Sequence, residues 1–171
     1  MKRLLYPLRT FLIVSGRIGE EVNVMAADWV TMVSADPFML GVSISPKRYT
    51  HKLITRYKEF VLSVPTIKLL REVWIAGTRS GPGKLSEMKI TLEKSRLIGV
   101  PSVKEAVANL ECRVVGSHDY GDHTLFIGEV VAYSFDENAF HQDEPIPGSG
   151  FILHLARNKF TVEDETVLRP D

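Results

Sequence analysis

The chain has 171 residues and a mass of 19.2 kDa, a size that favours one domain spanning residues 1–171. Hydrophobic residues make up 44% and charged residues 25%, so the chain can bury a core and does not fall in the disordered class. Its 21 Lys and Arg balance its 21 Asp and Glu, which argues against a protein that coats nucleic acid or an acidic membrane.

The single cysteine, Cys112, excludes an intramolecular disulfide framework and any metal site built from several cysteines. Near the N-terminus, Pro7 and Arg9 interrupt what would have to be the apolar core of a signal peptide. No apolar run approaches the ~20 residues that span a bilayer. We therefore expect a cytoplasmic protein with no membrane partner.

Short apolar runs bounded by turn residues predict seven strands, at residues 10–14, 22–30, 38–45, 59–64, 109–116, 124–135 and 151–155. Apolar spacings of three and four predict helices at residues 50–58 and 66–76, and a short helical turn at 84–88. Proline and glycine make residues 141–150 a loop. Strands and helices do not alternate regularly, which predicts a β-rich α+β protein: an antiparallel barrel with a few appended helices.

Several common motifs are absent. Residues 80–85 (Ser-Gly-Pro-Gly-Lys-Leu) lack the first glycine and the Ser/Thr of a phosphate-binding loop, and no G-x-G-x-x-G follows a strand. His118 and His123 are five residues apart, a spacing that fits neither one helix face nor one strand face, so we expect no metal site. Cys112 lies in an alternating strand and is expected in the core.

Residues 43–51 (Ser-Ile-Ser-Pro-Lys-Arg-Tyr-Thr-His) join an apolar strand to a helix. Thr50 is the predicted N-cap, and the hydroxyls and cations around it would hold a terminal phosphate at the helix N-terminus. The alternative is an ordinary cap beside two solvated basic residues.

Residues 23–31 (Asn-Val-Met-Ala-Ala-Asp-Trp-Val-Thr) contain two consecutive alanines in a strand. Small side chains let a flat aromatic ring lie against the backbone, whose polar groups would meet the rim of a flavin, with Trp29 as a wall. The alternative is a strand with small residues where a helix crosses it.

The same segments resemble the flavin reductase-like family of FMN-binding split β-barrels, which includes flavoredoxin and NAD(P)H:flavin oxidoreductases. The matching segments, in the family's order, are residues 23–31, 33–37, 42–50, 77–81, 108–113 and 121–130. The resemblance covers the chain from about Tyr6 to Phe160.

The resemblance implies a role for each matching residue. The ring of FMN would lie beside Asn23, Ala26, Ala27, Asp28 and Trp29. The ribityl phosphate would be held by Ser45, Arg48, Tyr49 and Thr50, and a loop near the ring would contribute Ser80, Gly81 and Lys84. His123 would approach the ring as the catalytic residue where the hydride donor or acceptor docks, against the alternative of a turn histidine.

Two departures from the family pattern affect these assignments. Lys84 follows Gly81 sooner than usual and precedes Leu85 instead of an aromatic residue, and Asp28 stands where relatives have a small or hydroxyl residue. An acidic group near the flavin would disfavour its reduced anion unless the side chain points away. Phe160 is the expected aromatic that closes the pocket, with Phe151 as its competitor.

The resemblance therefore implies a homodimeric FMN protein that takes hydride from NADH or NADPH and passes electrons to a flavin, a ferric chelate or a redox protein. One alternative is a flavoredoxin-type electron carrier that does not oxidise NAD(P)H efficiently. A second is a non-catalytic barrel dimer.

Overall fold

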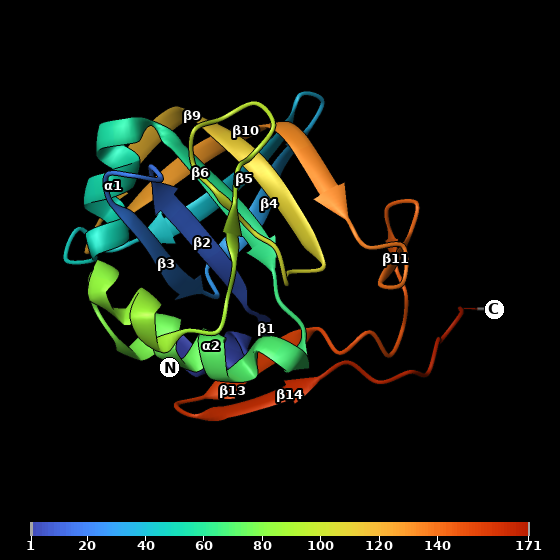
Figure 1. The fold of residues 1–171 in the computed structure, drawn as a ribbon. Coiled ribbons are helices and arrows are strands. Elements are labelled where there is room, and N and C mark those ends of the chain that lie inside the picture. The colour runs from blue at the N-terminus through green and yellow to red at the C-terminus, as the bar shows by residue number, and fades with distance from the viewer. Residues whose placement is uncertain (1, 171) are drawn as a thin grey trace.

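The computed structural model describes residues 2–170, which are built around a seven-stranded antiparallel sheet (Figure 1). Along the sheet the strands follow the order β3-β2-β6-β9-β10-β5-β4. Their bounds are β2 Phe11–Gly16, β3 Val22–Ala27, β4 Val30–Ala35, β5 Phe38–Ile44, β6 Glu59–Val64, β9 Ala108–Tyr120 and β10 His123–Phe135. The β-rich, antiparallel class predicted from the sequence is confirmed.

The two edge strands of this sheet, β3 and β4, are neighbours in sequence. Only Asp28 and Trp29 separate them, so the sheet must curl until its edges approach each other at this point. The ladder does not continue across the gap, because β3 pairs with β2 and β4 pairs with β5. The result is a barrel that is split along one seam, which we call the β3–β4 seam.

The prediction of one continuous strand over residues 22–30 is wrong. The chain turns at Asp28, and β4 then continues to Ala35 as a separate strand. The side chains of β4 are mostly exposed, so the alternation that marks a half-buried strand is weak there.

Two helices pack on the barrel. Helix α1 (Tyr49–Tyr57) follows β5 and buries Leu53 and Ile54, and helix α2 (Leu70–Thr78) lies against β3. Three 3₁₀ helices, η1 (Lys2–Leu5), η2 (Ile67–Leu69) and η3 (Pro82–Glu87), complete the helical part. The predicted helices are confirmed, although the second is divided into η2 and α2 and the third is a 3₁₀ helix.

Short strands outside the barrel form three small sheets. The largest joins β1 (Leu8–Arg9), β13 (Ile152–Ala156) and β14 (Lys159–Val162) below the barrel in Figure 1. Two hairpin pairs are β7 (Leu92–Glu93) with β8 (Ser102–Val103), and β11 (Phe140–His141) with β12 (Glu144–Pro145). The loop expected at residues 141–150 therefore carries part of a hairpin, and β14 was not predicted.

The core consists of two clusters of buried apolar side chains. One includes Phe60, Phe126 and Cys112, and the other includes Leu12, Val61 and Val73 beneath α2. The predicted core position of Cys112 is confirmed, and burial raises the pKa of its thiol. Within residues 2–170 no helix is long and apolar enough to cross a membrane.

Candidate functional site

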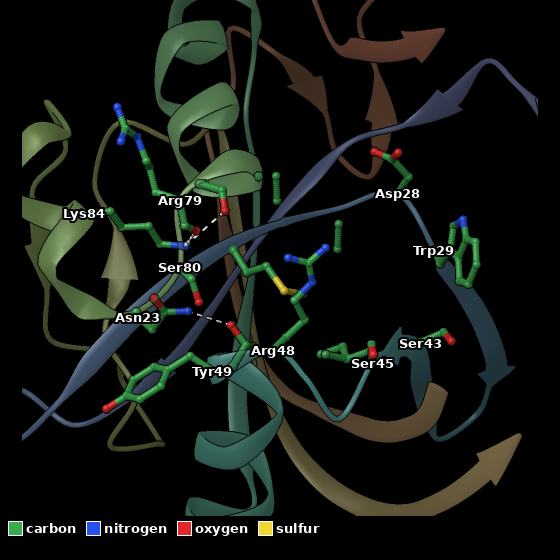
Figure 2. A pocket seen from close by; sticks show the side chains of 18 of the residues that line it. Asn23, Asp28, Trp29, Ser43, Ser45, Arg48, Tyr49, Arg79, Ser80 and Lys84 are labelled. Atoms are coloured by element: carbon green, nitrogen blue, oxygen red, sulfur yellow. Dashed lines mark hydrogen bonds between the residues drawn. The ribbon is translucent and has the colours of Figure 1, made fainter. Parts of the chain in front are cut away.

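A pocket opens at the β3–β4 seam, between the start of α1 and the end of α2 (Figure 2). It brings together nearly all of the residues predicted for the site. Its lining consists of Asn23, Met25, Ala26, Ala27, Asp28, Trp29, Ser43, Ile44, Ser45, Arg48, Tyr49, Thr50, Ala76, Gly77, Arg79, Ser80, Gly81, Lys84 and His123.

The N-terminus of α1 forms one wall of this pocket. Arg48 occupies the N-cap position with an extended backbone, and no side chain caps the helix. The first N–H groups of α1 are therefore available to an anion, and Arg48 also lines the pocket. The hydroxyl of Tyr49 donates to Glu21 and so is directed away from this role.

The prediction that Thr50 caps α1 is wrong. Thr50 is the second residue of the helix and is fully buried, and its Oγ1 accepts a hydrogen bond of 2.7 Å from Nδ2 of Asn23. This bond connects α1 to β3 across the floor of the pocket (Figure 2). Thr50 therefore orients the side chain of Asn23 and does not cap the N-terminus of α1.

The same bond leaves the other end of the Asn23 amide without a hydrogen bond from any residue within 2–170. Among the described residues, Oδ1 of Asn23 is a buried acceptor without a hydrogen-bond partner. Burying such a group without a partner costs free energy, so a donor from a bound molecule would stabilise it. Asn23 lines the pocket, although this oxygen itself is covered by its surroundings.

Lys84 reaches the pocket from η3 and is almost entirely buried, with 3% of its surface exposed. Its ammonium donates to the carbonyl oxygens of Ala76 at 3.0 Å and Arg79 at 3.1 Å, at the C-terminal end of α2. Burial, together with the nearby charge of Arg48, lowers the pKa of Lys84 to about 8. Lys84 thus holds the segment of Ser80 and Gly81 against the pocket and adds a positive charge to it.

Two aromatic rings stand at the mouth of the pocket. The ring centroids of Trp29 and His123 are 4.7 Å apart, with 39° between their planes. Nδ1 of His123 lies 2.8 Å from Oδ1 of Asp122, which fixes the orientation of the imidazole. Trp29 is 39% exposed, so a flat molecule can reach its indole face from solvent.

Asp28 lies at the seam with its carboxylate engaged by other residues. Oδ1 accepts a hydrogen bond of 2.8 Å from Thr10, while Oδ2 lies 2.7 Å from His154 and 3.3 Å from Tyr6. The carboxylate is thus directed toward these partners. An acid at this position is compatible with a reduced flavin only if its side chain points away from the ring, and the contacts of Asp28 meet this condition.

The structure places Phe160 outside the pocket. Its ring stacks on His154 at 4.7 Å and meets Trp74 edge-on at 6.4 Å, and it lines a separate groove along α2 and β14. Its competitor Phe151 is buried in the core. Neither residue closes the pocket within this chain.

Six residues that line the pocket were missed: Met25, Ser43, Ile44, Ala76, Gly77 and Arg79. Arg79 was the one with a usable signal, because it is a cation between the glycines of residues 77–81. The other five line the pocket because of their positions along β3 and β5 or at the end of α2. Their place in the pocket is known only when the arrangement of these strands and helices in space is known.

The charge of the pocket suits an anionic ligand. Arg48, Arg79 and Lys84 line it, and Asp28 is the single carboxylate among its described lining residues. No group of three or more His, Cys, Asp or Glu within residues 2–170 is placed to hold a metal ion. The arrangement fits a molecule that has a negative group at one end and a flat ring at the other.

The fold and this pocket define a split-barrel protein with a site for an anionic, ring-containing ligand. Residues 1–162 match the model of the flavin reductase like domain, and the chain belongs to this family. The family predicted from the sequence is confirmed.

Individual proteins show the same relationship. An uncharacterized protein of Pyrococcus abyssi is 56% identical over 99% of this chain and 98% of its own length. An NADH-dependent flavin reductase of a Rhodococcus species is 31% identical over 69% of this chain and 64% of its own.

Solved structures agree in fold across almost the whole chain. The FMN-binding protein of Thermus thermophilus, solved with bound 1-cyclohex-2-enone, has a TM-score of 0.87 and 32% identity over 97% of this chain and 92% of its own. Flavoredoxin from Methanosarcina acetivorans has a TM-score of 0.84 and 28% identity, over 96% and 89% of the two chains.

Proposed function

We propose that the pocket binds FMN, with the phosphate at the N-terminus of α1 and the flavin ring along the β3–β4 seam. The observation that carries this proposal is the uncapped start of α1 in a pocket that Arg48 and Lys84 also line. A dianionic phosphate would be stabilised by both cations and by the helix N–H groups. The Thermus thermophilus neighbour, described as FMN-binding, supports the choice of flavin.

The ring end of the pocket also fits this ligand. Ala26 and Ala27 have small side chains that leave room for a flat ring, and Asn23 lines the pocket beside them. In the proposed complex Ser45, Tyr49 and Thr50 accompany Arg48 around the phosphate, through backbone or hydroxyl groups. Ser80 and Gly81 border the ligand from the α2 side, and Asp28 and Trp29 border the ring.

We infer that the protein is an NAD(P)H:flavin oxidoreductase. Bound FMN would supply a ring that accepts a hydride from NADH or NADPH and later gives electrons to a flavin, a ferric chelate or a redox protein. Trp29 and His123 pack against each other at the mouth of the pocket, and their remaining ring surface can position a nicotinamide. The NADH-dependent flavin reductase of Rhodococcus supports this donor.

The test is an absorbance spectrum of the purified protein, taken before and after anaerobic addition of NADH and then of NADPH. Flavin bands that bleach with either nucleotide support the proposed reaction. A colourless protein that does not take up added FMN would contradict flavin binding and favour a non-catalytic barrel.

A flavoredoxin-type electron carrier is the second candidate, supported by the likeness to flavoredoxin from Methanosarcina acetivorans. In that case a protein partner would supply the electrons at the exposed edge of Trp29. Flavin bands that persist with both nucleotides and bleach only with dithionite would favour the carrier over the reductase.

His123→Ala is expected to slow the reduction of bound FMN by NADH about tenfold, because the nicotinamide loses one of its two positioning surfaces. FMN should remain bound, since His123 stands at the mouth and not at the phosphate end. Stopped-flow absorbance at saturating FMN measures the rate. His118→Ala, which changes an exposed histidine on β9 outside the pocket, is the control, and an equal rate in both variants would remove His123 from the site.

We propose that the protein is a homodimer joined through the face of β4. Met32 is 76% and Val33 49% exposed, directly after Trp29 at the mouth of the pocket. Exposed apolar side chains next to one another favour association. Val33→Lys should therefore yield monomers in light scattering, whereas Leu97→Lys, at an exposed leucine on a different loop, should not. A wild-type monomer would contradict the proposal.

A further inference from the structure

A half-buried acid–base pair, Asp28 and His154, lies at the seam end of the pocket, where Asp28 is one of the lining residues. Asp28 lies in the turn between β3 and β4, and His154 lies on β13, far away in the sequence. Nδ1 of His154 is 2.7 Å from Oδ2 of Asp28, and each side chain is only 16% exposed. The pair therefore interacts in a partly dry environment, where its charges are weakly screened.

The hydrogen-bond partners of this pair determine where its protons lie. Nε2 of His154 is 3.0 Å from the carbonyl oxygen of Arg157, which only accepts, so this nitrogen must donate. The carboxylate of Asp28 accepts from Thr10 and from Tyr6 and faces Nδ1 of His154 as a third donor. Three donors around one carboxylate fit its ionised form, and both nitrogens of His154 then carry a proton.

The packing of His154 fixes the ring in this position. Phe160 stacks on one side at 4.7 Å and Tyr6 meets the ring edge-on at 5.5 Å. With both nitrogens bonded and the ring packed, His154 is held to present its charge to Asp28. Phe160, which lies outside the pocket, thus acts on it through His154.

The charge of this pair matters because Asp28 is the single carboxylate among the described residues that line the pocket. Two-electron reduction adds negative charge to a flavin ring, and an uncompensated carboxylate nearby would oppose it. The positive charge of a protonated His154 would balance the negative charge of Asp28, so that the pair as a whole adds no net charge beside the pocket.

We propose that His154 is a positioning residue that neutralises Asp28 and thereby allows the pocket to stabilise the reduced form of bound FMN. The inference rests on the proposed function, because it assigns the pair a role toward the flavin. It predicts that His154 acts on the redox equilibrium without touching the ligand.

The test compares the midpoint potentials of FMN bound to the wild-type protein and to variants of this pair, all measured at pH 6. His154→Gln keeps a donor toward Asp28 but removes the positive charge, so the affinity for reduced FMN should fall about tenfold relative to oxidised FMN. That ratio corresponds to a potential about 30 mV more negative for a two-electron couple.

The double variant Asp28→Asn/His154→Gln separates charge from structure. The double variant is neutral, like the wild-type pair. Its midpoint potential should therefore differ from that of the wild type by no more than about a third of the shift seen in His154→Gln alone. If the substitutions acted by damaging the structure, the double variant would have a potential as low as the single variant, or lower. His141→Gln removes an exposed histidine on β11, away from the pocket, and should leave the potential unchanged. Nitrogen-15 NMR of the flavin-free protein at pH 6 should show both ring nitrogens of His154 protonated.

Each outcome decides the matter. An unchanged potential in His154→Gln, a double variant as low as the single one, or a His154 ring with one bare nitrogen would overturn the inference while FMN binding stands. If no form binds added FMN, the proposed function itself has failed and the inference falls with it.

Discussion

Arg48→Ala is expected to weaken the binding of FMN about 30-fold and to leave the binding of riboflavin nearly unchanged. Arg48 is the residue that precedes the uncapped α1, and it lines the pocket in which the proposed phosphate would lie. A hydrogen bond to a charged group contributes about 2 kcal/mol, which corresponds to this factor. Riboflavin carries no phosphate and loses no such contact. Fluorescence titration of the flavin-free protein with each ligand measures both affinities.

Lys47→Ala provides the matched control for this prediction. Lys47 is the neighbouring exposed cation, but it does not line the pocket, so its removal should change the FMN affinity less than threefold through weak long-range attraction. Equal losses of FMN and riboflavin in Arg48→Ala would refute the placement of the phosphate. Equal effects of the two substitutions would show only a general electrostatic contribution.

The affinity for FMN is expected to decrease about sevenfold between pH 7 and pH 9.5. The pKa of Lys84 is lowered to about 8 in the free protein by burial and by the charge of Arg48. A bound phosphate would stabilise the ammonium and raise this pKa, so binding takes up a proton above pH 8 and weakens as the pH rises. A pKa raised by about one unit gives the stated factor. Titrations at a series of pH values measure it.

The titration of Lys84 has the opposite effect on folding. As the pH rises, it weakens FMN binding but increases the free energy of unfolding, so the two effects can be distinguished. Because the pKa of Lys84 is lower in the folded chain than its ordinary value of 10.5, the unfolded chain binds more protons between pH 8 and 10.5. The contribution of Lys84 to the free energy of unfolding therefore rises with pH in that range. Weaker FMN binding at pH 9.5 would not reflect loss of this contribution.

Lys84→Arg tests the assignment, because a guanidinium keeps its charge throughout this pH range. The pH dependence of FMN binding should disappear in this variant, and riboflavin should show little pH dependence in either protein. A wild-type FMN affinity that is equal at pH 7 and pH 9.5 would contradict the role of Lys84.

Much of the barrel could be predicted from local patterns. The alternation of residues 109–116 and the apolar runs around Val24, Val42 and Val61 led to the right strands, because each has a buried face. The separate strand β4 was missed, since its exposed side chains carry no such alternation. The short strand β14 was missed because it is stabilised by β13 and not by an apolar pattern of its own.

The pocket was predicted less completely, because its geometry depends on contacts between distant segments. Thr50 had the chemistry of a helix cap, yet the N-cap position is two residues earlier, at Arg48, and the Thr50 hydroxyl is taken by Asn23. Nothing in the local sequence shows that Asp28 meets His154 or that Phe160 lies behind that histidine. Such partners are selected by the packing of β1 and β13 against the seam.

The order of strands in the barrel also bears on how the protein acquires its ligand during synthesis. Most of the pocket lies between Asn23 and Lys84, but β5, which leads into it, takes β10 as its second neighbour. Ser43 pairs with Leu125, so the wall of the pocket remains half-formed while the ribosome is still translating the middle of the chain. Pairings between such distant segments form late in folding. A ligand would therefore find a complete pocket only after β10 has been synthesised and has paired with β5.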